Sequence, residues 1–276
     1  MSTILAPLSR LEGHAVLRQR WFVAAVLLAV AMVGFFYVLA TRESDVLGFT
    51  GYGRVMAGVV QASLIFVPLL ALLATAQAVP SARDSGVLEW YMTLPVDRPA
   101  AFRALWWPRL VAVAGPAALA TLCLGGVALV TGRAVEPQLW ASLLALLSGQ
   151  AFCFAALGMM IGAYSRSSES ALVRALLLWA ACALLVDFIV LGLLLRWDLS
   201  PFAVFATASL NPMQAGRVGI LASIDPEMGA LGPVGTWAVV TLGAPLTTLW
   251  GLGWPFLVGV LALALGRWRF LRGDVL

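Results

Sequence analysis

The sequence predicts an all-α membrane protein with six transmembrane helices. Hydrophobic residues make up 62% of the 276 residues and charged residues only 11%, whereas a soluble domain carries about 25% charged residues. Crossing about 30 Å of hydrocarbon takes about 20 apolar helical residues, and six segments are long enough. They lie near residues 21–40, 57–80, 109–131, 138–164, 174–195 and 244–266. Because no soluble domain separates them, the whole chain, 1–276, is expected to form a single transmembrane domain.

The chain before the first span is expected to be a helix that lies in the membrane interface. Within residues 3–19, apolar side chains share one helical face and polar side chains occupy the rest. The apolar set is Ile4, Leu8, Leu11 and Ala15, and the polar set is Arg10, His14 and Arg18. The alternative is a frayed tail. Residues 21–40 are interpreted as a retained span, because this apolar run exceeds the core of a secretory signal.

The distribution of arginine sets the predicted orientation. All 17 basic residues are arginine, and with the N-terminus inside, twelve of them fall in the inner segments and five in the outer ones. Cytoplasmic loops carry the excess of positive charge in membrane proteins, so both termini are expected in the cytoplasm. The same rule accounts for the net charge of +4 without a nucleic-acid partner.

Residues 83–103 form a charged island after the uncharged run 55–82. Apolar side chains recur inside the island at the spacing of a short helix, namely Val87, Leu88, Tyr91, Met92 and Leu94. Ser85 is expected to cap this helix, Glu89 to lie near its positive end, and Pro95 to limit it. A cytoplasmic helix with so much apolar surface needs lipid headgroups or a protein partner to cover it.

The last outer segment, residues 196–243, is expected to contain a periplasmic helical element between spans five and six. Residues 228–266 carry no charge and are too many for one straight span. Glycine and proline break the early part of that run, at Gly232, Pro233, Gly235, Gly243 and Pro245. We expect a short interfacial or re-entrant helix there, and the alternative is a poorly ordered loop.

Missing residue types exclude several functions. Without lysine, the chain has neither a P-loop nor a Schiff-base lysine. Its one histidine, His14, excludes metal sites built on two histidines and disfavours a Ser-His-Asp triad. Cys123, Cys153 and Cys182 lack CxxC spacing and lie in apolar runs, where thiols pack as small buried residues. We therefore expect no catalytic residue, no metal site and no cofactor.

The charged island also carries a family pattern. It runs Asp84-Ser85-Gly86-Val87-Leu88-Glu89, then Leu94-Pro95-Val96-Asp97-Arg98, with a further basic residue at Arg103. This pattern resembles the cytoplasmic coupling segment of ABC-2 type transporter permeases, with valine at 87 and aspartate at 97 where the family has threonine and serine. The resemblance implies a non-catalytic subunit of the bacterial inner membrane. It further implies that the chain pairs with itself and with two cytoplasmic ATPase subunits.

The resemblance implies which residues contact the ATPase. Leu88, Trp90, Tyr91 and Leu94 would dock in a groove of that subunit, and Glu89 would pair with a basic residue there. The full coupling set is Ser85, Gly86, Leu88, Glu89, Trp90, Tyr91, Leu94, Pro95 and Arg98. In the alternative interpretation this helix rests on lipid headgroups.

Further short matches narrow the resemblance to permeases that serve the maturation of copper-containing nitrous oxide reductase. They are Leu47-Gly48-Phe49-Thr50, residues 68–73, Asp187 and Leu210-Asn211-Pro212. Such permeases hold a periplasmic copper-handling protein, NosD, so a similar partner is implied here. The residues implied to seat it are Phe202, Phe205, Asn211, Pro212, Met213 and Arg217. Alternatively, this segment is a lid over the outer end of the chain's own dimer.

Asp187 is a charged residue near the middle of the fifth predicted span. A charge at that depth costs on the order of 3 kcal/mol, so Asp187 is expected to face the bundle or a cavity. It serves either a conduit, a polar pair across the dimer, or packing. Three other functions stay open from the sequence: a generic ABC-2 exporter of lipids, drugs or peptides, an intramembrane enzyme, and an ion-coupled transporter.

Overall fold

The computed structural model describes residues 2–18, 22–23, 27, 31, 50–130, 137–185, 200–225, 228 and 232–273. These residues fold into helices and none of them forms a β-strand, which confirms the all-α prediction. Four described helices are long and apolar enough to cross a membrane: Val60–Asp84, Arg98–Cys123, Pro137–Tyr164 and Ala244–Arg272. Most of the predicted first span, the end of the predicted fifth span, and Asp187 lie outside the described residues.

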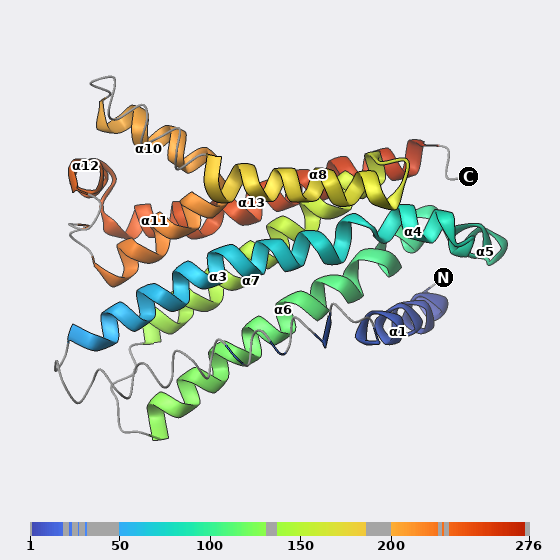
Figure 1. Ribbon diagram of the computed structural model, residues 1–276, viewed down its shortest axis with the longest axis horizontal. Helices are drawn as coiled ribbons and strands as arrows, with labels where there is room; N and C mark the ends of the chain where they lie inside the picture. The colour runs from blue at the N-terminus through green and yellow to red at the C-terminus, as the bar shows by residue number, and fades with distance from the viewer. Residues whose placement is uncertain are drawn as a thin grey trace.

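The bundle is organised around α7 (Pro137–Tyr164), which packs against α3 (Thr50–Ala76), α6 (Arg98–Val130) and α13 (Ala244–Arg272) (Figure 1). Glycines make these contacts close, as is common between membrane helices. A Cβ added at Gly158 would overlap Thr75 Oγ1, and one at Gly162 would lie 2.5 Å from the Ala76 carbonyl oxygen. The helices α3 and α7 therefore meet backbone to backbone along the centre of the bundle.

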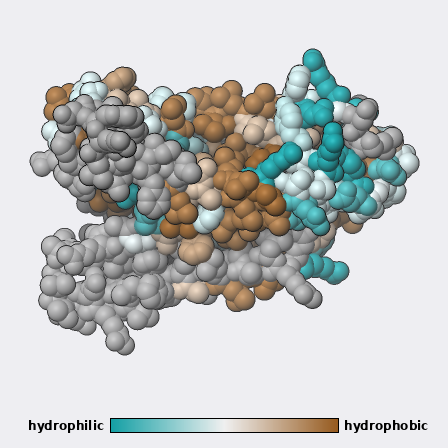
Figure 2. Space-filling view, turned by 45° about the horizontal axis from the view of Figure 1, so that its top comes forward, coloured by the Kyte–Doolittle hydropathy of each residue, from teal (hydrophilic) through white to brown (hydrophobic). Residues whose placement is uncertain are grey.

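The two ends of the bundle differ in composition. One end holds α1 (Ser2–Leu17), α4 (Ala78–Asp84), α5 (Val87–Thr93) and the C-terminal turn of α13 (Figure 1), and we name it the arginine-rich end. Hydrophilic side chains gather there, whereas hydrophobic side chains cover the middle of the molecule (Figure 2). The arginines at this end include Arg83, Arg98, Arg166, Arg269 and Arg272, all of them counted among the inner arginines of the sequence.

The opposite end contains α10 (Pro201–Leu210) and α12 (Gly232–Leu242) (Figure 1). Helix α12 occupies the segment where the sequence predicted a short helix before the last span, and Gly243 separates it from α13. A second feature was not predicted. Helix α11 (Pro212–Ile224) packs inside the bundle against α7 and α13, although its residues were assigned to an outer loop.

A glycine pair explains how α11 fits inside the bundle. A Cβ added at Gly251 of α13 would lie 2.5 Å from the backbone nitrogen of Gly219 on α11. The two helices thus cross at backbone contact, and α11 re-enters the bundle beside α13. Its first turn reaches the level of α8 (Ser168–Ala180) and of the π-helical turn Ala181–Leu185 that continues α8.

Candidate functional site

The chain reverses direction between α4 and α6, in a corner that spans residues 84–98, contains α5 and is named the α5 corner. Gly86 has a φ of 73°, a left-handed conformation that glycine adopts without steric cost. The Gly86 N–H donates to the Arg83 carbonyl at 3.1 Å. The prediction that Ser85 caps α5 is wrong, because Ser85 ends α4 and its hydroxyl donates to the Ser81 carbonyl at 2.7 Å.

One face of α5 is anchored in the protein's own core. Leu88 is fully buried and Tyr91 is 2% exposed, and both pack in a cluster with Phe102 and Leu105 of α6 and Phe270 of α13. Leu88 and Tyr91 are therefore covered by the chain's own helices, which leaves little of their surface for the predicted docking into a partner. Helical spacing identified residues that share a face, but it could not say that this face lies on α6 and α13.

The other face of α5 stays uncovered. Glu89 and Thr93 are exposed, and Trp90 is 51% exposed with its ring centroid 5.6 Å from that of Tyr91. Glu89 lies in the first helical turn as predicted, and α5 ends at Thr93, before Leu94 and Pro95. Leu94 is partly buried against the core cluster, and Pro95 and Arg98 are exposed. A half-exposed tryptophan beside an exposed carboxylate is the main feature that this surface presents.

Hydrogen bonds tie the α5 corner to the neighbouring helix ends. The Ser168 hydroxyl, at the start of α8, donates to Asp84 Oδ2 at 3.1 Å. The Arg83 guanidinium donates to the Ser165 carbonyl at 3.4 Å, and that of Arg98 donates to the Leu271 carbonyl at 3.2 Å. A displacement of the corner would therefore reach α7, α8 and α13 through polar contacts as well as through the core.

A buried polar group behind α5 was missed by the sequence reasoning. It consists of Glu12 of α1, Tyr91 of α5 and Arg109 of α6, which we name the Glu12 node. The Tyr91 hydroxyl donates to Glu12 Oε1 at 2.6 Å, and Arg109 forms an ion pair with Glu12 Oε2 at 3.1 Å. Burial raises the pKa of the Tyr91 hydroxyl, and its hydrogen bond to Glu12 raises that pKa further. Tyr91 therefore stays protonated and donates a stable hydrogen bond to the carboxylate.

The sequence does contain a signal for this node. Glu12 is the first acidic residue of the chain, and the next is Glu43. Arg109 is the one charged residue between Arg103 and Arg133. A charged side chain in an apolar helix requires a partner, so each residue could have been marked as half of a pair.

Most residues that were predicted to seat a periplasmic partner are buried within the chain. Phe205, Asn211 and Met213 have less than a tenth of their surface exposed, and Pro212 is buried as well, so these four present little surface for the predicted partner contact. Asn211 Oδ1 accepts from the Met213 N–H at 3.0 Å and its amide donates to the Cys182 carbonyl at 2.6 Å. Asn211 thus caps α11 and fixes it to the end of α8.

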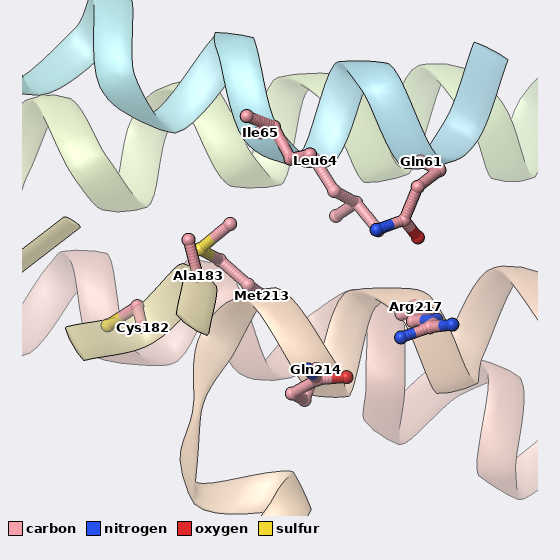
Figure 3. A pocket seen from close by; sticks show the side chains of 8 residues that line it. All are labelled: Gln61, Leu64, Ile65, Cys182, Ala183, Met213, Gln214 and Arg217. Atoms are coloured by element: carbon pink, nitrogen blue, oxygen red, sulfur yellow. The ribbon is translucent and has the colours of Figure 1, made fainter. Parts of the chain in front are cut away.

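The remaining two residues of that set have accessible surface. Phe202 is 59% exposed, and its ring centroid lies 5.6 Å from that of Trp237. Arg217 is partly exposed and lines a small pocket between α3, the π-helical turn and α11 (Figure 3). The pocket is lined by Gln61, Leu64, Ile65, Cys182, Ala183, Met213, Gln214 and Arg217. Within the described residues, no group of three or more His, Cys, Asp or Glu side chains is placed to hold a metal ion.

Comparisons with known proteins add to this geometry. A family described as ABC-2 family transporter protein matches residues 6–275. A probable ABC transporter permease protein NosY from Stutzerimonas stutzeri is 26% identical over 269 residues, which cover 95% of this chain and 97% of that protein. A protein of the same description from Pseudomonas aeruginosa is 30% identical over 224 residues, which cover 76% of this chain and 78% of that protein.

Proposed function

The chain belongs to the ABC-2 transporter family, and we propose that the exposed face of its α5 corner is the surface through which a separate ATPase subunit moves the membrane helices. The observation that carries the proposal is the division of α5 into two faces. Leu88 and Tyr91 fix the helix to the core, while Glu89 and Trp90 are left for a partner. A helix that only rested on lipid headgroups would not need buried side chains that fix it to the rest of the protein.

The contact chemistry fits a protein groove. A half-exposed tryptophan is the type of side chain that anchors interfaces, because it buries a large surface with few rotatable bonds. Glu89 beside it would pair with a basic side chain of the ATPase, and the pair gains strength when the contact excludes water. The coupling set is accordingly revised. Glu89, Trp90, Leu94, Pro95 and Arg98 contact the partner, while Ser85, Gly86, Leu88 and Tyr91 shape and hold the helix.

Movement would spread from α5 because its anchors are rigid. The cluster under Leu88 and Tyr91 joins α4, α6, α7 and α13, and close-packed side chains transmit displacement instead of absorbing it. The bond from Arg98 to the Leu271 carbonyl adds a link to the end of α13. A push on Trp90 would therefore tilt several helices together, and two of them, α7 and α13, also pack against α11.

The finer proposal concerns what this motion serves. The two relatives named NosY, together with the short sequence matches, support a permease that acts in copper delivery for nitrous oxide reductase. The chain would act as a homodimer in the inner membrane with both termini in the cytoplasm. A periplasmic copper-handling partner similar to NosD would then meet the α10–α12 end, where Phe202 and Arg217 have accessible surface.

Purification from native membranes tests these proposals at separate levels. We expect the tagged full-length chain to bring down an ATP-binding subunit, with a second copy of the chain in the complex. Glu89→Arg should abolish that association while the variant still elutes as a folded species. Recovery of the ATPase with the Glu89→Arg variant would contradict the coupling surface. A periplasmic copper-binding protein in the wild-type complex would support the NosY-like role, and an ATPase alone would favour a generic exporter.

A further inference from the structure

The Glu12 node joins three elements that lie far apart in the sequence. Glu12 belongs to α1, Tyr91 to α5 and Arg109 to α6, and all three residues are less than a tenth exposed. Helix α1 packs mainly along α6. A polar contact links it to α5, the hydrogen bond from the Tyr91 hydroxyl to the Glu12 carboxylate at 2.6 Å. The carboxylate thus holds α5 and α6 at once, one through each oxygen.

The three groups depend on one another. An unpaired carboxylate or guanidinium that is shielded from water is strongly unfavourable. Here the two Glu12 oxygens are occupied by Tyr91 and Arg109, and the Arg109 guanidinium also donates to the Leu105 carbonyl one helical turn earlier. Moving α5 away from α1 would therefore leave one oxygen of a buried carboxylate without a donor, so the two helices are expected to move together.

The outer face of α1 indicates what this helix contacts outside the protein. Leu11 and Leu17 are exposed, and so are Arg10 and Arg18 beside them. Exposed leucines next to arginines are typical of a helix that lies at the surface of a bilayer, with apolar side chains among the acyl chains and arginines at the headgroups. The face of α1 that turns toward the bundle carries Glu12 and Val16, which are both buried.

From these contacts we infer that α1 is a positioning element for the coupling surface: the Glu12 node fastens α5 to a helix that is itself held by the lipid surface. This inference rests on the proposed function. Tyr91 and Glu12 do not contact the ATPase in this account. They set the angle at which Trp90 and Glu89 are presented, and they carry the force from α5 into α1 and α6.

Hydrogen–deuterium exchange on the purified full-length chain in lipid nanodiscs tests the link without any ATPase. Glu12→Ala keeps the helix propensity of α1 but removes both bonds, so amides 87–93 of α5 should exchange roughly tenfold faster. Tyr91→Phe keeps the ring in its cluster and removes only the hydroxyl, and it should loosen α5 in the same way. The matched controls Glu169→Ala and Tyr164→Phe alter an exposed glutamate and an exposed tyrosine at the same end, and should leave α5 unchanged.

Faster exchange confined to α1 in the Glu12→Ala variant, with α5 at its wild-type rate, would overturn the inference. The complex with the ATPase gives the second measurement. Tyr91→Phe should retain the ATPase, because Trp90 and Glu89 are intact, yet lower the stimulated hydrolysis rate roughly three- to tenfold. Wild-type stimulation in Tyr91→Phe would sink the positioning role alone. If the wild-type chain binds no ATPase, the proposed function fails, and the exchange experiment still decides whether α1 and α5 are linked.

Discussion

The α5 corner and the turn between α10 and α11 are both short breaks between helices in a largely apolar chain. The two breaks differ in which of their groups the rest of the protein covers. At the α5 corner one face is packed and the other is left exposed at Glu89 and Trp90. At the turn formed by residues 210–212, which we name the α11 turn, side chains from two helices donate to the backbone. Trp254 donates to the Leu210 carbonyl at 3.3 Å, and Gln150 donates to the Pro212 carbonyl at 2.8 Å.

The difference follows from where each break lies. Backbone carbonyls at membrane depth have no water to bond, so a turn there persists only where protein groups satisfy it. A third contact runs in the opposite direction, from the Asn211 side-chain amide to the Cys182 carbonyl, so the α11 turn is bonded to α7, α13 and the end of α8. The α5 corner lies among charged residues at the end of the bundle and has no such need. Its unsatisfied feature is apolar surface, which a partner can cover. The α11 turn is thus satisfied by groups of the chain itself, whereas the α5 corner leaves apolar surface uncovered.

The largest effect should come from overfilling the helix crossing that carries the α11 turn. A Cβ at Gly251 would lie 2.5 Å from the Gly219 nitrogen and from the Ala215 carbonyl oxygen, and backbone atoms cannot move aside as a side chain can. We expect Gly251→Ala to lower the free energy of unfolding by roughly 3 kcal/mol, measured by denaturation in detergent. Gly253→Ala is the matched control two residues along α13, because its Cβ would meet nothing within 4 Å. Equal stability of the two variants would contradict the buried position of α11.

Removing a bond at the α11 turn should cost less. Asn211→Ala removes the cap of α11 and the bond to the Cys182 carbonyl, for a combined loss of about 2 kcal/mol. Ser200 caps α10 in the same way through the Ala203 N–H, but it is exposed. Ser200→Ala should therefore lose about 1 kcal/mol or less. If both substitutions destabilise equally in thermal unfolding, the α11 turn is no more dependent on protein partners than an exposed one.

Substitutions on the exposed face of α5 should leave the stability of the chain unchanged and weaken its association with the ATPase. Trp90→Ala removes half-exposed surface, so the unfolding midpoint should stay near that of the wild type. Loss of an aromatic anchor typically costs about 2 kcal/mol of binding, which corresponds to roughly thirtyfold weaker ATPase affinity in a titration. Trp107 of α6 is similarly exposed at 53% on a helix that crosses the membrane, and Trp107→Ala should bind the ATPase normally. Equal ATPase affinities for the two variants would contradict the proposal that the exposed face of α5, and not that of α6, binds the ATPase.

The sequence predicted the α5 corner better than the α11 turn, for a physical reason. Charge, helical spacing and proline are local signals, and they located a short helix that contains Glu89 and ends before Pro95. The family resemblance read from the same residues is confirmed by the match over 6–275. Which face of α5 is buried depends on α6 and α13, and that information is not local. The spacing therefore could not show that Leu88 and Tyr91 face the chain's own core.

The α11 segment shows the same limit more strongly. Its composition resembles that of an interfacial loop, and its burial depends on Gly251 of a helix that begins after it. The partners within the Glu12 node could not be identified from the sequence either, because Glu12 and Arg109 meet only once α1 packs along α6. Glycines and isolated charges are the residues whose role depends most on such distant contacts. The sequence marks them as unusual without naming their partners.

The smallest expected effect concerns the backbone of the α5 corner itself. Gly86 has no atom within 4 Å of an added Cβ, so packing would tolerate alanine, but its φ of 73° would not. A left-handed residue with a side chain costs about 1 kcal/mol. Gly86→Ala should therefore lower stability slightly in thermal unfolding, and Gly86→Asn should lower it less, since asparagine tolerates this conformation. Gly115→Ala on α6 meets no neighbour and has no positive φ, so it should be neutral or mildly stabilising. If Gly86→Ala behaves like Gly115→Ala, the corner does not depend on its left-handed residue, and its exposed face is held by Leu88 and Tyr91 alone.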